Sequence, residues 1–510
     1  MSQDSSGHPA AMGHYDVAIV GYGPTGAVLA NLLALCGLQV LVVEREGGIY
    51  PLPRAVHFDD ETMRVFQTIG IADALRQKVR LNPGMRFVDV DGTLLLDWPR
   101  PQETTRHGWN ASYRFHQPDL EALLRRSVQT HPNITVRTKT ELLRLTQKSD
   151  HVALQCHDLA CGVTSHATAS YVVGCDGARS MVRRQMGVVM EDLGFRQSWL
   201  VVDVLLRREM PELGDHSVQF CDAKRPMTYC RSPQNRRRWE ITMQAGETAA
   251  EMTDPDRVWQ FLSRWITPDD AQIERSVVYT FESALAETWR KHRLLLAGDA
   301  AHLTPPFLGQ GMCSGIRDAA NLAWKLALQV KGRGACGVLD SYGPERSPHM
   351  RAYVETAIQL GQVINSVDGE SGTSGGGAGA DEKSKMASIA PGIGGAAAAC
   401  FGVAPGPHAG RLFGQPLLDR GRRMDDVCGY RPIVITRAPV PAGAGDGPKA
   451  VSALGPVFLN AQSEPALAVE LAALQVNAVV IRPDRYILAT AVSDADVRDL
   501  TGLEFPSPLS

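Results

Sequence analysis

Asp16-Val-Ala-Ile-Val-Gly-Tyr-Gly-Pro-Thr-Gly26 is the stretch from which the fold of this chain can be worked out. Its apolar half is typical of a buried parallel strand. We expect a helix over about residues 25–35, with Gly37 ending it, and a second buried strand over residues 39–43. Strand, glycine turn, helix and strand within about 30 residues form a βαβ unit.

The three glycines of this turn have separate tasks. Gly21 permits a tight turn, Gly23 lets the backbone approach a pyrophosphate, and Gly26 lets helix and strand pack closely. Glu44 closes the second strand, where an acidic residue binds a ribose hydroxyl. The alternative for Glu44 is a solvated carboxylate at a strand end. The unit predicts a dinucleotide site without deciding between FAD and NAD.

A second glycine-rich stretch follows a later apolar strand. Residues 295–306 read Leu-Leu-Ala-Gly-Asp-Ala-Ala-His-Leu-Thr-Pro-Pro, and Gly309-Gln-Gly311 precedes a predicted helix over 315–330. The strand delivers Asp299 to its carboxyl end, where ligands bind in open α/β sheets and a carboxylate can hold the hydroxyls of a sugar alcohol. A helix N-terminus suits a reduced flavin, which carries negative charge. The stretch therefore favours FAD.

A third motif, Cys175-Asp176-Gly177-Ala-Arg-Ser180, lies between the other two. In this order and spacing the three motifs resemble the class A flavoprotein monooxygenases, the group of para-hydroxybenzoate hydroxylase and phenol hydroxylase, over about residues 14–360. Four further stretches make the chain most similar to the 3-(3-hydroxyphenyl)propanoate hydroxylases: Pro53-Arg-Ala-Val-His-Phe-Asp-Asp-Glu61, Phe115-His-Gln-Pro-Asp-Leu-Glu121, Arg237-Arg-Trp-Glu-Ile241 and Arg482-Pro-Asp-Arg-Tyr486.

The resemblance implies an α/β fold with a Rossmann-like FAD-binding domain, an interleaved sheet-rich substrate domain and a C-terminal thioredoxin-like domain. The expected boundaries are residues 14–190 and 285–365 for the FAD-binding domain, with part of 80–115 joining the substrate sheet, 191–284 for the substrate domain, 366–400 for a Gly/Ala-rich flexible linker, and 401–510 for the C-terminal domain. That last domain has no CxxC, so we expect a structural or oligomer-forming role without redox activity.

Several secondary-structure elements can be placed from their patterns. A helix is expected over Gln117–Val128, and strands over Thr135–Arg144 and Val152–His157. Asp59 and Asp60 precede a helical stretch, where one of them is expected to cap it, although a role in proton transfer is the alternative. In the C-terminal segment, we expect strands over Pro432–Thr436 and Ala478–Arg482 and a helix over Pro465–Leu474.

The resemblance assigns most of the cofactor contacts. Arg54 and Gln117 are expected to contact the phosphate and ribityl region, and Asp176 and Gly177 to serve both FAD and the nicotinamide. The full set of expected cofactor-binding residues is Gly21, Gly23, Pro24, Thr25, Gly26, Glu44, Arg45, Arg54, Gln117, Asp176, Gly177, Asp299, Pro306, Gly309, Gly311 and Met312.

Candidate catalytic residues are His57, Arg238 and Tyr229. His57 can orient or deprotonate a phenol, since histidine titrates near neutrality, and its alternative is a hydrogen-bonded loop histidine. By the resemblance, Arg238 matches a position that lies close to the flavin in para-hydroxybenzoate hydroxylase.

The expected substrate-binding residues are Arg225, Tyr229, Arg231, Pro306 and Phe307. An arginine can clamp a carboxylate and a tyrosine can bind the phenol oxygen, although the 225–231 region reads equally well as a polar surface loop. His302 is expected to brace the Asp299 loop.

The function implied by the resemblance is an FAD-dependent, NAD(P)H-using monooxygenase. Reduced flavin would react with O2 to form a C4a-hydroperoxide, which hydroxylates a phenol ortho to its hydroxyl group. The expected substrate is a 3-hydroxyphenylpropanoate-like acid, and NADH is favoured over NADPH by resemblance only. The alternatives are a flavin monooxygenase of another aromatic compound (polyketide, quinolone or pyridine derivative), a flavin oxidase or dehydrogenase without oxygen transfer, and a redox-sensing binding protein.

The composition limits which classes of binding partner we expect for this protein. The 510 residues carry a formal net charge of -3 and no basic run, which disfavours nucleic acid. Ten unpatterned cysteines are typical of a reduced cytoplasmic protein, and no metal ligands are spaced together. No apolar stretch is long enough for a membrane span. We expect a small aromatic substrate as partner and, by analogy, a possible homodimer.

Overall fold

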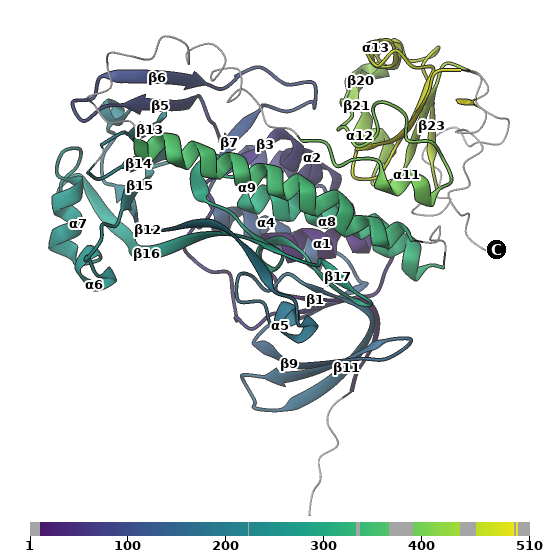
Figure 1. The fold of residues 1–510 in the computed structure, drawn as a ribbon, viewed down its shortest axis with the longest axis horizontal. Helices are drawn as coiled ribbons and strands as arrows, with labels where there is room; N and C mark the ends of the chain where they lie inside the picture. Colours follow the sequence, from purple (N-terminus) through teal and green to yellow (C-terminus); the bar gives the residue numbers. More distant parts are fainter. Residues whose placement is uncertain are drawn as a thin grey trace, which may run out of the picture.

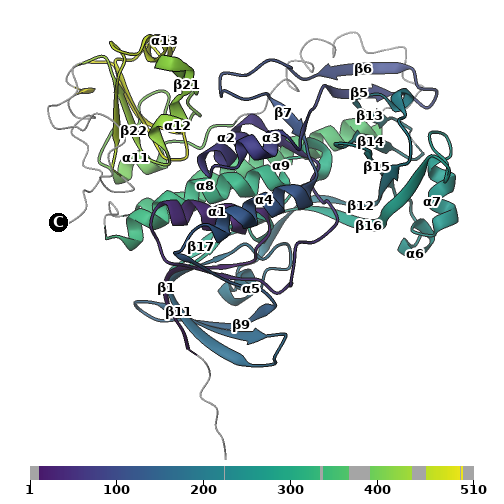
Figure 2. The same ribbon diagram turned by 180° about the vertical axis from the view of Figure 1, so that it is seen from behind.

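The computed structural model describes residues 11–222, 224–332, 337–366, 391–438, 455–493 and 496–497. Figures 1 and 2 show three parts: a central sheet covered by helices, a second sheet on one side, and a smaller C-terminal unit on the other. Among these described residues, no helix is long and apolar enough to cross a membrane.

The three glycine-containing motifs begin at one edge of the central sheet. Its parallel strands β1 (Ala11–Val20), β11 (Thr164–Gly174) and β18 (Leu294–Leu296) lie side by side. Their last residues are in register, because Val20 pairs with Gly174 and Gly174 pairs with Leu296. The turns that follow all three strands therefore emerge together.

The same sheet contains further strands. On the other side of β1, β2 (Val40–Val43) and β8 (Ile134–Arg137) continue the parallel arrangement. Beyond β11, β9 (Thr140–Gln147) and β10 (Val152–Asp158) form an antiparallel extension, and β17 (Arg290–Lys291) pairs with β18. The single strand expected over Thr135–Arg144 is wrong: the chain breaks at Lys139, whose φ is 51°, and so divides it into β8 and β9.

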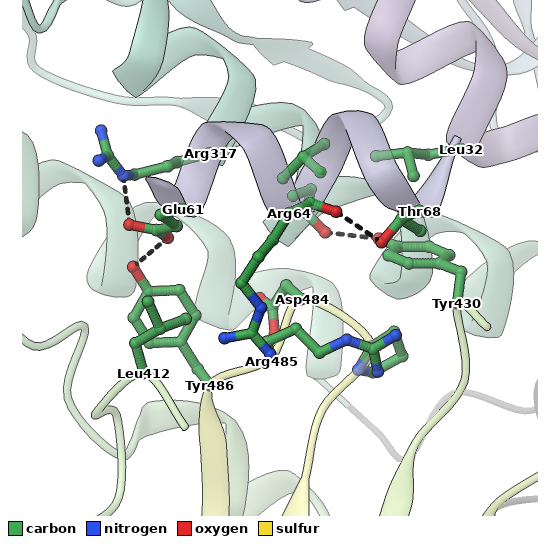
Figure 3. Close-up of a pocket in the computed structure, with 13 residues that line it drawn as sticks. Leu32, Glu61, Arg64, Thr68, Arg317, Leu412, Tyr430, Asp484, Arg485 and Tyr486 are labelled. Atoms are coloured by element: carbon green, nitrogen blue, oxygen red, sulfur yellow. Dashed lines mark hydrogen bonds and ion pairs between the residues drawn. The ribbon is translucent and has the colours of Figure 1, made fainter. Parts of the chain in front are cut away.

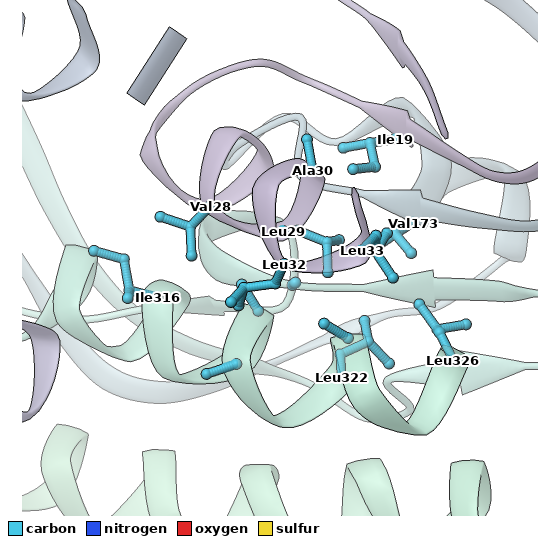
Figure 4. Close-up of a cluster of buried hydrophobic side chains, with 14 of the residues drawn as sticks. Ile19, Val28, Leu29, Ala30, Leu32, Leu33, Val173, Ile316, Leu322 and Leu326 are labelled. Carbon is cyan, nitrogen blue, oxygen red and sulfur yellow. The ribbon is translucent and has the colours of Figure 1, made fainter. Parts of the chain in front are cut away.

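Two helices enclose the core beside this sheet. Helix α1 (Pro24–Leu35) is apolar on all sides and buried along its length, as expected of an internal helix. Figure 4 shows it between the sheet, at Ile19 and Val173, and helix α8 (Gly311–Val330), at Ile316 and Leu322. Each fully buried leucine here stabilises the fold by roughly 1.5–3 kcal/mol. Helices α4 (Gln117–Gln129) and α9 (Tyr342–Ser366) complete the layer.

The second sheet has the strand order β19-β16-β12-β15-β14-β13-β5-β6. Its strands are β5 (Gly84–Val88), β6 (Leu94–Pro99), β12 (Met190–Leu206), β13 (Ser217–Phe220), β14 (Met227–Arg231), β15 (Arg236–Thr242), β16 (Ala271–Ala286) and β19 (His302–Leu303). Strand β5 comes from an earlier part of the chain and pairs in parallel with β13. Helices α6 (Ala249–Met252) and α7 (Pro255–Leu262) cover one face of this sheet.

A small three-stranded sheet lies between the two large ones. Its order is β3 (His57–Asp59), β7 (Ser112–Arg114) and β4 (Arg80–Leu81). Helix α2 (Asp60–Thr68) follows β3 directly, and Asp59 caps it by accepting the Thr62 N–H at 2.9 Å. The expected capping role is thereby confirmed for Asp59.

The C-terminal unit has a four-stranded mixed sheet of order β23-β22-β24-β25. Its strands are β22 (Ile433–Thr436), β23 (Val457–Asn460), β24 (Ala478–Ile481) and β25 (Ile487–Ala491), and α13 (Pro465–Ala473) packs against them. The strand and helix positions expected at 432–436, 465–474 and 478–482 are confirmed. The arrangement agrees with a thioredoxin-like fold.

The expected linker at 366–400 is described only in part. Residues 367–390 lie outside the described residues. Its last part is not the flexible segment we expected: α11 (Ala396–Cys400) forms a short helix with Ala397 and Ala398 buried, and the Ala397 N–H donates to Glu345. Alanine is the best helix former, and its small side chain allows close packing.

Candidate active site

The N-termini of α1 and α8 and the Asp299 turn meet at Thr25. A Cβ placed on Gly298 would lie 2.7 Å from Oγ1 of Thr25, and one placed on Gly315 would lie 2.3 Å from the same atom. Both distances are below normal contact, so only glycine fits at these two positions. The first and second motifs are therefore packed against each other directly.

The first glycine turn is equally tight on one side and open on the other. Gly21 has φ 102°, and a Cβ there would lie 2.3 Å from the Cys175 carbonyl oxygen. A Cβ on Gly26 would lie 2.1 Å from the Gly21 oxygen. By contrast, a Cβ on Gly23 would meet nothing within 4 Å. The open side is where a pyrophosphate would approach.

Helix α1 begins at this open side without a side-chain cap, with Pro24 in its first turn. Free N–H groups at a helix N-terminus are a ready anion site. Glu44 lies beside the turn: one carboxylate oxygen accepts the Tyr22 N–H at 2.7 Å and the other accepts the Glu46 N–H at 2.8 Å. These bonds fix the carboxylate and leave lone pairs for ribose hydroxyls. Arg45 is exposed and pairs with Glu46 at 3.2 Å.

Asp299 is the exposed residue in a buried run. Its neighbours from Leu294 to Ala301 are buried, while Asp299 itself is exposed and makes no side-chain hydrogen bond or ion pair with any described residue. The segment Pro306–Met312 that follows is partly exposed, unlike the rest of α8. A free carboxylate and an open helix N-terminus thus face the same region.

A buried network that sequence reasoning missed supports the Asp299 turn. Asp318 of α8 accepts the Gly298 N–H at 3.0 Å and pairs with His302 at 2.7 Å and Arg346 at 2.8 Å. Burial acts to raise the pKa of Asp318, but His302 and Arg346 outweigh it and lower that pKa. As predicted, His302 braces the turn.

Both carboxylate oxygens of Asp176, in the third motif, accept hydrogen bonds from other groups of the protein. One of its oxygens accepts the Ser180 hydroxyl at 2.5 Å, and the other accepts the N–H groups of Met181 and Val182, which begin helix α5 (Met181–Met186). Arg183 of α5 then donates to the Ala300 carbonyl oxygen at 2.8 Å. In this structure the motif therefore supports the Asp299 turn. Gly177 has φ 75° and lies in the turn before α5.

Gln117 and Arg238 hold the loop that contains Arg54. The side-chain oxygen of Gln117 accepts the N–H groups of Arg54 at 3.0 Å and Ala55 at 2.8 Å. Arg238 donates to the carbonyl oxygens of Pro53 at 2.5 Å and Arg54 at 2.8 Å. Both residues bind the backbone of this loop, and their expected contacts with the flavin stay predictions.

His57 lies beside the Gly309 turn. Its Nε2 is 2.8 Å from the Ser112 hydroxyl and its Nδ1 is 3.4 Å from the Gly309 carbonyl oxygen. Burial, reinforced by the positive charge of Arg114, lowers the pKa of His57 to about 4. The imidazole is therefore neutral at pH 7, and protein groups occupy both nitrogens. This geometry favours the hydrogen-bonding alternative over a free base.

The remaining candidate residues of the second sheet lie on its two opposite faces. Register places Ser217, Cys230, Arg238, Asp203 and Arg275 on one face, which we call the inner face because Arg238 and Arg275 donate from it to Pro53. A buried ion cluster ties it together: Asp203 pairs with both Arg238 and Arg275.

The opposite face carries Tyr229, which the structure therefore does not bring together with Arg238. Tyr229 stacks near Trp239, with ring centroids 5.1 Å apart, in the core beneath α7. Burial raises the pKa of its hydroxyl to about 12. Arg231 shares this face and pairs with Asp215 at 2.6 Å. Neither residue faces the Arg54 loop.

Arg225 is also occupied elsewhere. It pairs with Glu247 at 2.6 Å and lies over the Phe261 ring. Phe307 does lie at the junction of the two sheets, where its ring packs edge-on against Phe195 and Trp199. Among the expected substrate residues, Pro306 and Phe307 therefore remain next to the cofactor motifs, while Arg225, Tyr229 and Arg231 do not.

The C-terminal unit contacts the back of this site. Figure 3 shows Tyr486 donating to Glu61 of α2, while Arg317 of α8 holds the other oxygen of the same carboxylate. The two distances are 2.7 and 2.6 Å. Arg317 also pairs with Asp59, which lies two residues from His57. A chain of polar contacts thus joins the C-terminal unit to strand β3, a link that sequence reasoning missed.

These features fit FAD. An uncapped α1 with open space at Gly23 suits a pyrophosphate, Glu44 suits a ribose, and the unpaired carboxylate of Asp299 suits the ribityl chain. The partly exposed start of α8 suits the flavin ring. Among the described residues, no group of acidic, histidine or cysteine side chains has the arrangement of a metal site.

Comparison with known proteins agrees with this geometry. The FAD binding domain family matches residues 14–357, and the chain belongs to that family. A probable NADH-specific resorcinol 4-hydroxylase of Rhodococcus jostii is 42% identical over 351 residues, which cover 68% of this chain and 65% of the relative. A 3-(3-hydroxyphenyl)propionate/3-hydroxycinnamic acid hydroxylase of Mycolicibacterium gilvum is 40% identical over 354 residues, covering 69% and 60%.

These alignments therefore span somewhat less than two thirds of each relative's length. Among solved structures, the flavin-dependent monooxygenase PieE, in complex with FAD and substrate, superposes with a TM-score of 0.79 at 21% identity, covering 97% of this chain and 99% of PieE. That likeness shows that the fold is shared over nearly the whole chain, the C-terminal unit included.

Proposed function

We propose that this protein is an FAD-dependent aromatic monooxygenase that uses NADH and O2 to hydroxylate a phenol ortho to its hydroxyl group. The observation that carries the proposal is the meeting of three motifs at one sheet edge, with the unpaired Asp299 carboxylate and the open start of α8 facing the same region. Bound FAD supplies the hydride acceptor and the activation of O2.

The residues of this chain bind, orient and shield the reactants. Glu44 and the start of α1 would hold the ADP half of FAD, and Asp299 would hold the ribityl chain. The N-terminus of α8 stabilises negative charge that develops on the ring system. His57 fixes the Gly309 turn through its ring, and Phe307 packed against Trp199 excludes water from the junction of the sheets.

The substrate proposal rests on the relatives. One relative is named for resorcinol and several for 3-(3-hydroxyphenyl)propionate, so a phenol with a substituent at the meta position is the shared chemistry. The name of the resorcinol relative also supports NADH as reductant.

The proposal is tested by the NADH oxidation rate of the purified FAD-loaded protein with 3-(3-hydroxyphenyl)propanoate, with resorcinol and with neither. We expect one of the two phenols to accelerate NADH oxidation at least about tenfold, with a product heavier by one oxygen atom. Acceleration accompanied only by hydrogen peroxide would mean that the phenol binds without being a substrate. Equal rates in all three samples, with peroxide as the product, would favour a flavin oxidase.

A further inference from the structure

Positive charge without a carboxylate partner lies beside His57 in the small sheet. His57 pairs with Arg114 across strands β3 and β7, so both side chains emerge on the same face. Arg114 is buried, with 9% of its surface exposed, and it forms no ion pair with any described residue. Its buried Nε has no hydrogen-bond partner in the described structure. Burying a guanidinium without a counter-charge destabilises the folded protein, unless another negatively charged group neutralises it.

The nearby carboxylates are already paired. Asp59 holds Arg317, and Asp203 holds Arg238 and Arg275. Glu240 lies 3.6 Å from Arg238. None of these carboxylates forms an ion pair with Arg114.

Arg114 links the small sheet to the inner face of the second sheet. One of its terminal nitrogens donates to the Ser217 hydroxyl, and Ser217 lies on the inner face beside Cys230. Arg114 therefore spans from the strand that carries His57 to the sheet that carries Arg238. A second arginine, Arg100, lies close by: it stacks on Trp98 at 4.3 Å and also has no ion pair with a described residue.

We propose that Arg114 binds the carboxylate of an anionic aromatic substrate, with Arg100 adding to the positive field. The proposal rests on the proposed function and specifies its substrate class: a phenol with a carboxylate-bearing side chain is preferred over a neutral phenol. An arginine fork can hold both oxygens of a carboxylate, which fixes the ring's orientation as well as its affinity. The unpaired Nε and the buried guanidinium supply the donors.

The test measures binding separately from turnover. Isothermal titration calorimetry of the FAD-loaded protein uses 3-phenylpropanoate, which has no ring hydroxyl, and its neutral analogue 3-phenylpropanamide. We expect tighter binding of the acid than of the amide. Arg114→Gln should weaken binding of the acid by roughly 10- to 100-fold, because a charge-assisted hydrogen bond is lost, and should erase the preference for the acid.

Two further variants separate charge loss from misfolding. Arg114→Lys keeps the charge, so it should retain more affinity for the acid than Arg114→Gln. Arg80→Gln is the matched control: Arg80 pairs with Arg114 across the same small sheet, but its side chain is more exposed and forms an ion pair with Asp215 at 2.5 Å. It should bind the acid as the unmodified protein does.

Each outcome decides the matter. Unchanged acid affinity in Arg114→Gln, or equal losses for acid and amide, would overturn the proposal. Turnover of a neutral phenol by the unmodified protein reports on the proposed function independently. If phenols are oxidised and Arg114→Gln has no effect, only the carboxylate site fails. If no phenol is oxidised while the preference for the acid depends on Arg114, the carboxylate site stands and the proposed function fails.

Discussion

At the glycine turn between β1 and α1, contacts of single atoms set the shape of the backbone that would receive a nucleotide. Gly21 is held against the Cys175 carbonyl, and Gly26 is held against Gly21, while Gly23 opens outward. The sequence motif predicted the tight turn at Gly21 and the close packing at Gly26, because steric requirements this strict permit only glycine, while the task of Gly23 stays a prediction. The sequence did not indicate that Gly298 and Gly315 would enclose Thr25, since that contact joins segments nearly 300 residues apart.

Gly21→Ala tests the turn. The added Cβ would lie 2.3 Å from a backbone oxygen, so the strand-to-helix turn must open and displace the phosphate-binding N–H groups. We expect the purified variant to lose most of its bound flavin, measured as the ratio of flavin to protein absorbance.

Gly70→Ala is the matched control for that variant. Gly70 also has a positive φ, 80°, but its Cβ would meet nothing within 4 Å. It should cost about 1 kcal/mol of stability and keep full flavin content. Full flavin content in Gly21→Ala would contradict the account of the turn.

Side-chain roles were harder to predict than positions. Gln117, Arg238 and His57 all lie beside the expected cofactor region, yet each binds backbone or side-chain groups of the protein. A motif fixes where a residue lies, whereas the partner depends on loops that fold next to it. Arg114 was missed because its significance is the absence of an ion-pair partner among the described residues, and a sequence alone cannot reveal that.

At the level of elements, alternation along β14 and β15 decides which side chains can meet the cofactor. Tyr229 lies in the apolar core and Arg231 shares its face of the sheet, whereas Cys230 and Arg238 point to the inner face. The pattern of alternation is visible in the sequence. Which face is inner depends on the pairing of β12 with β15 and on the position of the Arg54 loop, and both require the tertiary structure.

Helix α9 contributes a second element-level feature, the buried carboxylate of Glu345. It accepts from Lys325 at 2.7 Å, Asn321 at 2.9 Å and Arg482 of the C-terminal unit at 2.8 Å. Burial acts to raise the pKa of Glu345, but Arg482 and Lys325 outweigh it and lower the pKa to about 2. The carboxylate therefore stabilises the folded state above pH 4.5, the ordinary value for glutamate, and that contribution is lost as the pH falls towards 2.

Glu345→Gln removes this charge and leaves the buried Lys325 without a carboxylate partner among the described residues, while Arg482 keeps only its ion pair with Asp484. We expect the free energy of unfolding at pH 7 to fall by about 3–5 kcal/mol, measured by urea denaturation. The difference between the variant and the unmodified protein should shrink as the pH falls from 4.5 towards 2.

The control lies on the same helix. Glu355 is exposed and 3.9 Å from Arg351, so Glu355→Gln should change stability by no more than about 0.5 kcal/mol. Similar losses in the two variants would indicate that the buried cluster has no special role.

For the whole molecule, the C-terminal unit and the FAD-binding part act as one structure. Arg482 and Tyr486 reach Glu345 and Glu61 of the FAD-binding part. Arg64 of α2 reaches Asp425 of the C-terminal unit, which Arg485 also pairs with inside that unit. The stretch Arg482-Pro-Asp-Arg-Tyr486 entered the sequence argument only as part of a resemblance, and the structure shows that its side chains form the contact between the two parts. The thioredoxin-like arrangement was predictable from strand patterns, whereas this docking was not.

The central claim is that oxygen from O2 enters an aromatic ring on this protein. The most direct measurement is a single reaction under 18O2 with the FAD-loaded protein, NADH and 3-(3-hydroxyphenyl)propanoate or resorcinol, followed by mass analysis of the product. The account predicts that the hydroxylated product of at least one phenol carries one 18O atom from the gas. NADH consumption with peroxide and no 18O-labelled product from either phenol would contradict it.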